Sequence, residues 1–198
     1  MSNTLGCDTA TTINQDQIQT LLSGGYTFVG RYLRHLSKEE AKLITGSGIC
    51  IVSLYEVNPT HREYFTAARG RTDAADAIQN ADRVGQTHHK PIYFTVDYDA
   101  SDDDVKGCIS AYLQAVKDEF DKDGNRYALG LYGSGAVLTH FQDTYTYTWL
   151  AGASGWRGSK GYTGWSIRQY ANGSTIGSGS GSILIDKDES KGSGGGWL

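Results

Sequence analysis

Short apolar runs alternate along the chain with longer amphipathic stretches, a pattern typical of strands connected by helices. The run ICIVSLYE is the strongest of them, because it is rich in the β-branched residues that buried strands favour. Together the runs predict eight strands, at residues 5–8, 27–33, 49–56, 91–97, 126–133, 147–151, 165–170 and 183–186.

Amphipathic stretches separate most of the first six predicted strands. One predicted helix begins at Ser37, and Glu40 stands three residues later, the spacing of a capping box in which the two side chains and backbones bond reciprocally. The apolar spacing predicts further helices at residues 14–22, 72–84, 101–120 and 137–141, the third of them capped by Ser101. Little helix is predicted after the sixth strand.

Strands that alternate with helices at this spacing are normally parallel and connected by crossovers. An open doubly wound sheet and a closed barrel both fit this order, and eight strands favour a single (β/α)8-type, TIM-like α/β barrel. The 198 residues fall short of the roughly 250 usual for such a barrel, so helices in the C-terminal part should be short or missing. No glycine-rich phosphate loop follows the first strand, which disfavours a nucleotide-binding sheet.

The chain length indicates one domain, which we expect over residues 1–190. The last eight residues, KGSGGGWL, predict a flexible tail at 191–198, in which Trp197 has no expected role.

Composition excludes several kinds of protein. The formal net charge of −4 gives no basic surface for nucleic acid, and no apolar run reaches the roughly 20 residues that span a bilayer. The N-terminus carries no recognisable signal peptide. Three widely spaced cysteines, Cys7, Cys50 and Cys108, fit neither a disulfide framework nor a zinc site, and we interpret them as small buried residues. The five histidines show no zinc-binding spacing.

Candidate chemistry gathers where the predicted strands end. Barrel enzymes place their catalytic groups at the carboxyl ends of strands, and acidic side chains crowded at one mouth raise one another's pKa. Four of the eight strands end in or near a carboxylate, namely Asp8, Glu56, Asp97 and Asp186. Three other strand ends carry polar groups that could contact a sugar, namely Arg31, Tyr132 and Gln169, although each also has a structural interpretation.

The segment FTVDYD places Asp97 and Asp99 two residues apart. On a strand both side chains would point the same way, with Cα atoms about 6.5–7 Å apart. Glycoside cleavage needs such a pair, one carboxyl to protonate the leaving oxygen and one carboxylate to assist the sugar or water. In the alternative interpretation, Asp99 begins a solvated acidic loop. A calcium or magnesium site at Asp97 and Asp99, or at Asp186 and Asp188, is a further alternative.

Several motifs together resemble a known family: Gly6-Cys7-Asp8, FVGRYL, the strand ending Tyr55-Glu56, IYFTVDYD, LGLYG, WSIRQY and ILIDKD. They resemble, in order, the glycoside-hydrolase-like TIM-barrel domains of Rv2525c-like type, which are related to the family 25 lysozymes. The resemblance covers residues 5–188. It implies a barrel and cleavage between N-acetylmuramic acid and N-acetylglucosamine in peptidoglycan, without cofactor or metal.

The resemblance also implies an acidic site at Asp8, Asp97, Asp99 and Asp186. The lysozymes carry Asp-x-Glu where this chain has Asp97-Tyr98-Asp99, so the proton-donating Glu is replaced by a shorter residue. We assign Asp99 as the general acid and Asp97 as its partner, with Asp8 and Asp186 tuning the pair. Glu56 is the reserve candidate for the acid. Among the tryptophans Trp149, Trp156 and Trp165, we include Trp165 with the substrate-binding groups, although a core position is the alternative for each.

Two functions from different classes remain. The first is a monomeric muramidase that reaches the periplasm or cell wall by a delivery apparatus or another non-classical route, with a possible immunity protein as partner. The second is a non-catalytic barrel that binds cell-wall glycan and has lost the usual acid. Chitin-like or capsular polysaccharides are alternative substrates.

Overall fold

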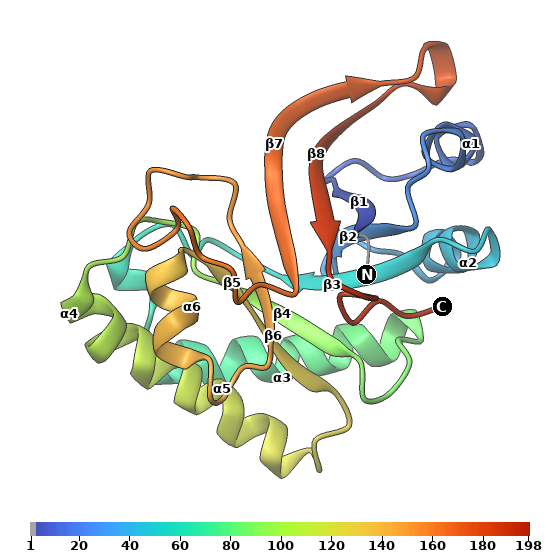
Figure 1. The fold of residues 1–198 in the computed structure, drawn as a ribbon. Helices are drawn as coiled ribbons and strands as arrows, with labels where there is room; N and C mark the ends of the chain where they lie inside the picture. Colours follow the sequence, from blue (N-terminus) through green and yellow to red (C-terminus); the bar gives the residue numbers. More distant parts are fainter. Residues whose placement is uncertain (1–2) are drawn as a thin grey trace.

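Residues 3–198 are described by a computed structural model, in which eight strands close into a barrel (Figure 1). Each strand pairs with the next along the chain, and the last pairs with the first. The strands are β1 (Thr4–Asp8), β2 (Phe28–Tyr32), β3 (Cys50–Tyr55), β4 (Pro91–Thr95), β5 (Ala128–Gly133), β6 (Tyr147–Leu150), β7 (Ile167–Ile176) and β8 (Ile183–Ser190). The predicted TIM-like barrel is confirmed.

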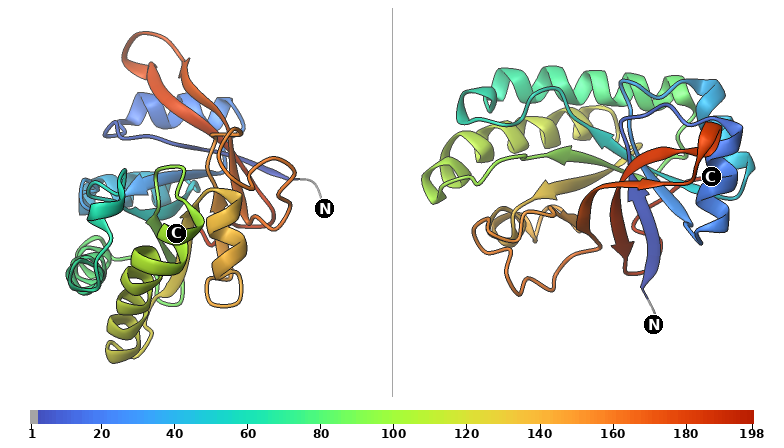
Figure 2. Two further views of the ribbon diagram at one scale, coloured as in Figure 1. Left: turned by 90° about the vertical axis from the view of Figure 1, so that its left-hand side faces the viewer. Right: turned by 90° about the horizontal axis from the view of Figure 1, so that it is seen from above.

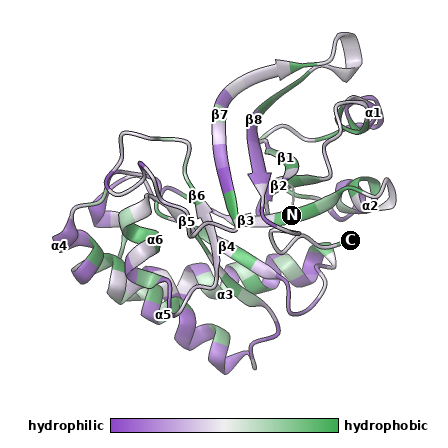
Figure 3. Cartoon of the chain, viewed as in Figure 1, coloured by the Kyte–Doolittle hydropathy of each residue, from purple (hydrophilic) through white to green (hydrophobic). Residues whose placement is uncertain are grey.

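Helices pack around the outside of the barrel (Figure 2). They are α1 (Gln15–Ser23), α2 (Lys38–Gly46), α3 (Ala67–Val84), α4 (Asp102–Asp104), α5 (Ser110–Lys122) and α6 (Gly135–Phe141), and a π-helical turn joins α4 to α5. Helices α3 and α5 lie side by side, and each has an apolar face buried against the barrel and a polar face outside, so both colours alternate along them (Figure 3). None of the helices within residues 3–198 has the length and apolar run required to cross a membrane.

One helix cap and two helix starts differ from prediction, since α6 also begins two residues early, at Gly135. Ser37 caps α2 by accepting a hydrogen bond from Glu40 N, but the Glu40 carboxylate bonds elsewhere, to Arg31 and to Ile13 N, so the predicted reciprocal capping box is absent. Helix α3 begins at Ala67, ahead of the predicted start at residue 72, because Thr66 caps it and its first turn, AARG, lacks the long apolar side chains that marked the helix in the sequence.

Strand β8 runs antiparallel to both of its neighbours, whereas β1 to β7 are parallel. The expectation of parallel strands is therefore wrong for β8. Only residues 177–182 separate β7 from β8, too few for a crossover, so the two strands form a hairpin that rises above the barrel (Figure 1). Asp186 consequently reaches the mouth from the middle of an antiparallel strand and not from a strand end.

The barrel interior is filled by aromatic side chains that lie over glycines. A Cβ added at Gly30 would lie 2.5 Å from the Trp149 ring, and one at Gly130 would lie 2.7 Å from Tyr93. These glycines leave the space that the rings occupy, since barrel interiors are packed solid. The inner core consists of Phe28, Val52, Leu54, Tyr93, Trp149 and Ile167.

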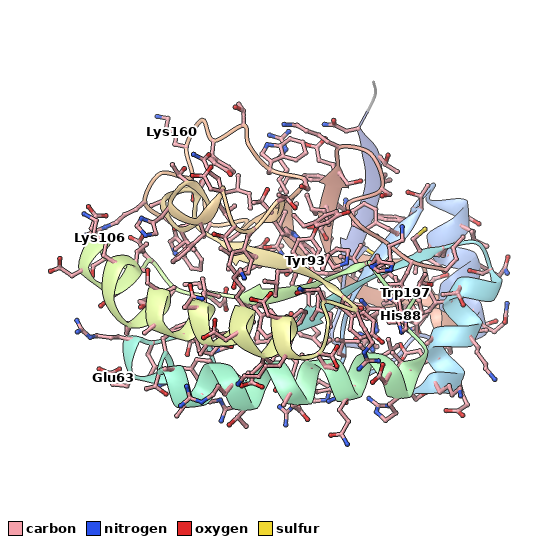
Figure 4. The ribbon with its side chains drawn as sticks, turned by 90° about the horizontal axis from the view of Figure 1, so that it is seen from below. Glu63, His88, Tyr93, Lys106, Lys160 and Trp197 are labelled. Carbon is pink, nitrogen blue, oxygen red and sulfur yellow. The ribbon has the colours of Figure 1, made fainter. Side chains whose placement is uncertain are left out.

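The C-terminal residues 191–198, predicted to be a flexible tail, pack across the barrel end opposite the mouth (Figure 4). Trp197 is 3% exposed, forms a β-bridge with Ile51, and donates from Nε1 to Ser53 Oγ at 2.9 Å. Tyr93 donates from its hydroxyl to Gly194 O at 2.7 Å. The sequence did not predict this packing, because the glycine-rich segment shows no apolar periodicity. Its glycines allow the tight turns that bring Trp197 back to the barrel.

We expect Trp197→Ala to lower the free energy of unfolding by about 3–5 kcal/mol, because it removes a buried indole and leaves a cavity. Leu198→Ala is the matched control, since Leu198 is 63% exposed. Chemical denaturation of both variants measures the difference. Equal stability of the two would show that the C-terminal segment does not pack.

Candidate active site

A cavity of about 220 Å³ opens at the mouth of the barrel, where the parallel strands end. Its walls come from all eight strands or from residues within two positions of their ends. The lining residues are Asp8, Tyr32, Leu54, Glu56, Thr95, Asp97, Tyr132, Trp149, Gln169, Asn172 and Asp186. The four carboxylates predicted from separate strand ends thus line one pocket, as do Tyr132 and Gln169.

Glu56 and Asp97 form the first half of this acidic pocket. Glu56 directly follows β3, Asp97 comes two residues after the end of β4, and these two strands are neighbours in the barrel. Burial of the Glu56 carboxyl, together with the negative charge of Asp97, raises the pKa of Glu56 to about 7. Burial also raises the pKa of Asp97 above its ordinary value. A carboxyl that holds its proton near neutrality can act as a general acid.

Asp8 and Asp186 form the second half, directly opposite each other on β1 and β8. Burial and the charge of Asp186 raise the pKa of Asp8 to about 7. Gln169 Nε2 connects the two, donating to Asp8 Oδ2 at 2.9 Å and to Asp186 Oδ2 at 3.0 Å. Asp186 Oδ1 also accepts from Gly173 N at 2.6 Å, in the raised part of the hairpin.

Gln169 faces the pocket and also forms hydrogen bonds to other parts of its wall. Its Oε1 accepts hydrogen bonds from Gly152 N at 3.0 Å and from the Tyr132 hydroxyl at 3.2 Å. Because both ends of the amide are bonded, its orientation is fixed, with the NH2 toward the two carboxylates. Both the sugar-contact and the structural interpretations of its sequence position therefore have support.

Three predicted site residues lie outside the pocket lining. Asp99 is exposed, and its carboxylate accepts a hydrogen bond from Arg157 N at 2.8 Å. The reason is that β4 ends at Thr95, so strand alternation no longer applies at Asp97 and Asp99 and does not place them side by side. The predicted Asp97–Asp99 pair is not formed in the pocket.

Arg31 is fully buried on the outer side of the barrel wall. It forms an ion pair with Glu40 of α2 at 2.9 Å and donates to Thr9 O. Trp165 is buried next to Arg168 and Lys191, whose cationic groups lie 5.0 and 4.1 Å from its ring centre. The tryptophan that lines the pocket is Trp149, on β6.

Several residues of the site were not among the predicted site residues: Leu54, Thr95, Trp149 and Asn172 line the pocket, and two further residues, Tyr32 and Asp188, carry titratable groups. Tyr32, at the end of β2, lines the pocket with its hydroxyl group among the carboxylates, and burial and the Asp8 charge raise its pKa. Asp188 is fully buried beneath Asp8, and its Oδ1 accepts from Trp149 Nε1 at 3.1 Å. The two-residue spacing of Asp186 and Asp188 was the available signal, and it was interpreted only as a metal-site alternative.

Metal ligation has no support from the side-chain arrangement. Within residues 3–198, no group of three or more His, Cys, Asp or Glu side chains is placed to hold a metal ion. Nor does any lysine or arginine appear among the described residues that line the pocket. The acidic groups in it are therefore stabilised by protons and by hydrogen bonds from neutral donors.

The family model described as "Rv2525c-like, glycoside hydrolase-like domain" matches residues 19–190. The Bacillus subtilis protein YbfG is 35% identical over 92% of the chain, which spans 28% of the length of YbfG. The crystal structure of the Tat-secreted protein Rv2525c from Mycobacterium tuberculosis, in complex with L-tartrate, superposes with a TM-score of 0.81 at 21% identity, and each chain is covered in full.

A bacterial lysozyme from Streptomyces coelicolor has the same fold at lower similarity. Its TM-score is 0.64 at 15% identity, covering 98% of this chain and 94% of the lysozyme. The barrel is thus shared with cell-wall lytic enzymes.

The raised pKa of Glu56 predicts a pH-dependent stability. A carboxyl whose pKa is raised on folding stabilises the folded state below its unfolded pKa, and this contribution is lost as pH rises toward the folded pKa of about 7. We therefore expect Glu56→Gln to raise the unfolding temperature relative to wild type at about pH 8 more than at about pH 5. Asp99→Asn, which removes a carboxylate outside the pocket, is the control. A difference for Glu56→Gln that is the same at both pH values would contradict the prediction.

Proposed function

The chain belongs to the family of Rv2525c-like, glycoside hydrolase-like domains, and on this premise we propose that it cleaves glycosidic bonds of bacterial peptidoglycan by muramidase-type hydrolysis. The observation that carries the proposal is the pair Glu56 and Asp97, which line one pocket and differ in their pKa shifts. The shared fold with a bacterial lysozyme favours peptidoglycan as the substrate class.

Glu56 is the proposed general acid, in place of Asp99. Its raised pKa of about 7 lets the carboxyl hold a proton near neutral pH, and it gives this proton to the glycosidic oxygen as the bond from that oxygen to the sugar carbon breaks. Asp99 stands where the family 25 lysozymes have glutamate, but it lies outside the pocket lining and bonds to backbone. Glu56 enters the pocket from the neighbouring strand with a longer side chain.

Asp97 is the proposed partner of Glu56. As a carboxylate it can steady the positive charge that develops on the sugar, or orient the substrate acetamide or a water molecule. Water then adds to the sugar carbon, and its proton returns to an acidic group of the pocket. Asp8 and Asp186 make the pocket more negative, which favours a cationic transition state.

The polar side chains between the acids provide sugar contacts. Tyr32 and Tyr132 present hydroxyl groups to the cavity, and Asn172 lies at its rim on the hairpin. Hydroxyl and amide groups on rigid strands suit the hydrogen-bonding groups of a polysaccharide. Trp149 lines the pocket wall but is fully buried, so its indole has no exposed face on which a sugar could stack.

The exposed position of Asp99 favours a second candidate function, a barrel that binds cell-wall glycan without cleaving it. This candidate predicts retention on purified peptidoglycan with no release of muropeptides or reducing ends. In either function the substrate lies outside the cytoplasm. For the hydrolase we propose a monomer, with an immunity protein of the producing cell as a candidate partner, since a wall hydrolase endangers its producer.

We expect Glu56→Gln to lower turnover on purified sacculi on the order of 10²–10⁴-fold, the usual contribution of a general acid. Asp97→Asn should also abolish most product release, whereas Asp99→Asn should retain turnover comparable with the wild type. Mass spectrometry of released muropeptides measures all three. Loss of activity in Asp99→Asn with retention in Glu56→Gln would reverse the assignment, and binding without products from the wild type would favour the second candidate.

The pKa shifts predict a bell-shaped dependence of turnover on pH. The rate should rise as Asp97 ionises, with a pKa raised by burial, and fall as Glu56 loses its proton near pH 7. A pH series of the cleavage rate measures both limbs. A rate that keeps rising well above pH 7 would exclude Glu56 as the acid.

A further inference from the structure

Asp188 is a carboxyl group enclosed in the barrel interior, and no cationic side chain of residues 3–198 forms an ion pair with it. The residue is 0% exposed, and it lies on β8 opposite Gly6 of β1 and Gln169 of β7. Trp149 Nε1 donates to its Oδ1 at 3.1 Å, whereas its buried Oδ2 accepts no hydrogen bond. An ionised carboxylate in this position would carry a large desolvation cost with only one donor against it.

The titratable groups around Asp188 add negative charge or none. Asp8 and Cys7 approach from β1, Tyr132 from β5 and Asp186 from its own strand. Within residues 3–198, none of the ion pairs joins a lysine or arginine to Asp188. A carboxyl crowded by other carboxyls in a low-dielectric interior keeps its proton.

We propose that Asp188 is a positioning residue, whose protonated carboxyl donates a hydrogen bond from Oδ2 to Asp8 and makes Asp8 the member of the pair that ionises toward the pocket. The proposal rests on the proposed function for its consequence in turnover, but the location of the proton is a property of the folded protein. It explains why a buried Oδ2 without an incoming donor is tolerated, because a protonated oxygen donates instead of accepting.

The pKa shifts of Asp188 and of Asp8 both agree with a hydrogen bond donated from Asp188 to Asp8. Burial and the charge of Asp8 raise the pKa of Asp188 well above its ordinary value, and the hydrogen bond between the two carboxyls lowers the pKa of Asp8. Asp8 therefore accepts from two neutral donors, Asp188 below and Gln169 Nε2 at 2.9 Å beside it. These bonds fix the carboxylate of Asp8 in one orientation at the floor of the pocket.

Trp149 connects Asp188 to the packed interior of the barrel. Its indole bonds to Asp188 and lies over Gly30, where a Cβ would come within 2.5 Å of the ring and 2.8 Å of Asp8 Cβ. Trp149, Asp188 and Asp8 are thus held in line by the packing of three strands. A shift of Asp188 would move the floor of the pocket without touching substrate.

Two substitutions separate a proton donor from a charged group. In Asp188→Asn, the amide Nδ2 can donate to Asp8 and the amide oxygen can accept from Trp149, so the neutral geometry survives. Asp188→Leu has similar size and can do neither. We expect Asp188→Leu to lower kcat about 10- to 100-fold with little change in KM, the usual range for partners that orient a reactive group. Asp188→Asn should restore most of that loss.

Two further measurements serve as controls. Ser190→Ala, at a buried position on the same strand, reports any general disturbance of β8. Circular dichroism checks that each variant folds. An Asp188→Asn variant as inactive as Asp188→Leu, with both folded, would overturn the proposal, because it would require an ionised Asp188.

Stability as a function of pH tests the proton without any assay of cleavage. The folded pKa of Asp188 is raised, so its stabilising proton is fully bound below the unfolded value of about 4 and its contribution is lost as pH rises. Asp188→Asn has no such loss. Its unfolding temperature minus that of the wild type should therefore increase between about pH 4 and pH 8, and a flat or falling difference would refute the proposal. If the wild type releases no products, this result still decides where the proton lies, and only the proposed function fails.

Discussion

The site depends on one electrostatic constraint. Several carboxyl groups are crowded in a closed barrel, and no cationic side chain among the described residues of the pocket lining neutralises them. Asp8, Glu56, Asp97 and Asp186 line one cavity, and Asp188 lies beneath it. Because no basic side chain is among the described residues of that lining, the acids are stabilised by keeping protons and by accepting from amides, an indole and backbone N–H groups. This arrangement costs stability, and the same cost keeps an acidic proton available near neutral pH.

The interior packing of the barrel makes such crowding possible. Glycines on β2 and β5 leave space for Trp149 and Tyr93, and these rings connect the site to the lower barrel. Trp149 bonds to Asp188, and Tyr93 bonds to the C-terminal segment, which also inserts Trp197. The floor of the pocket therefore rests on a continuous column of side chains, so its carboxyls cannot move apart to relieve their repulsion.

The β7–β8 hairpin makes this barrel differ from one with eight parallel strands. Its antiparallel direction brings Asp186 opposite Asp8 and leaves Asp188 one step deeper, so one strand supplies both a surface carboxyl and a buried one. On the other side of the mouth, β4 ends before Asp97, and the loop carries Asp99 away to Arg157. The acidic pair consequently forms between strands, from Glu56 and Asp97, instead of along one strand.

The sequence by itself determined the barrel, the strand ends and most of the pocket, because apolar periodicity marks strands and their ends meet at one mouth. It identified Asp8, Glu56, Asp97, Tyr132, Gln169 and Asp186 as facing that mouth. Only the tertiary structure decided which acids pair, that Arg31 faces Glu40, and that Trp197 is buried. Pairing depends on where each strand stops and in which direction β8 runs, and a local pattern does not encode either. The protonation of Asp188 likewise follows from burial among distant strands, which only the folded chain creates.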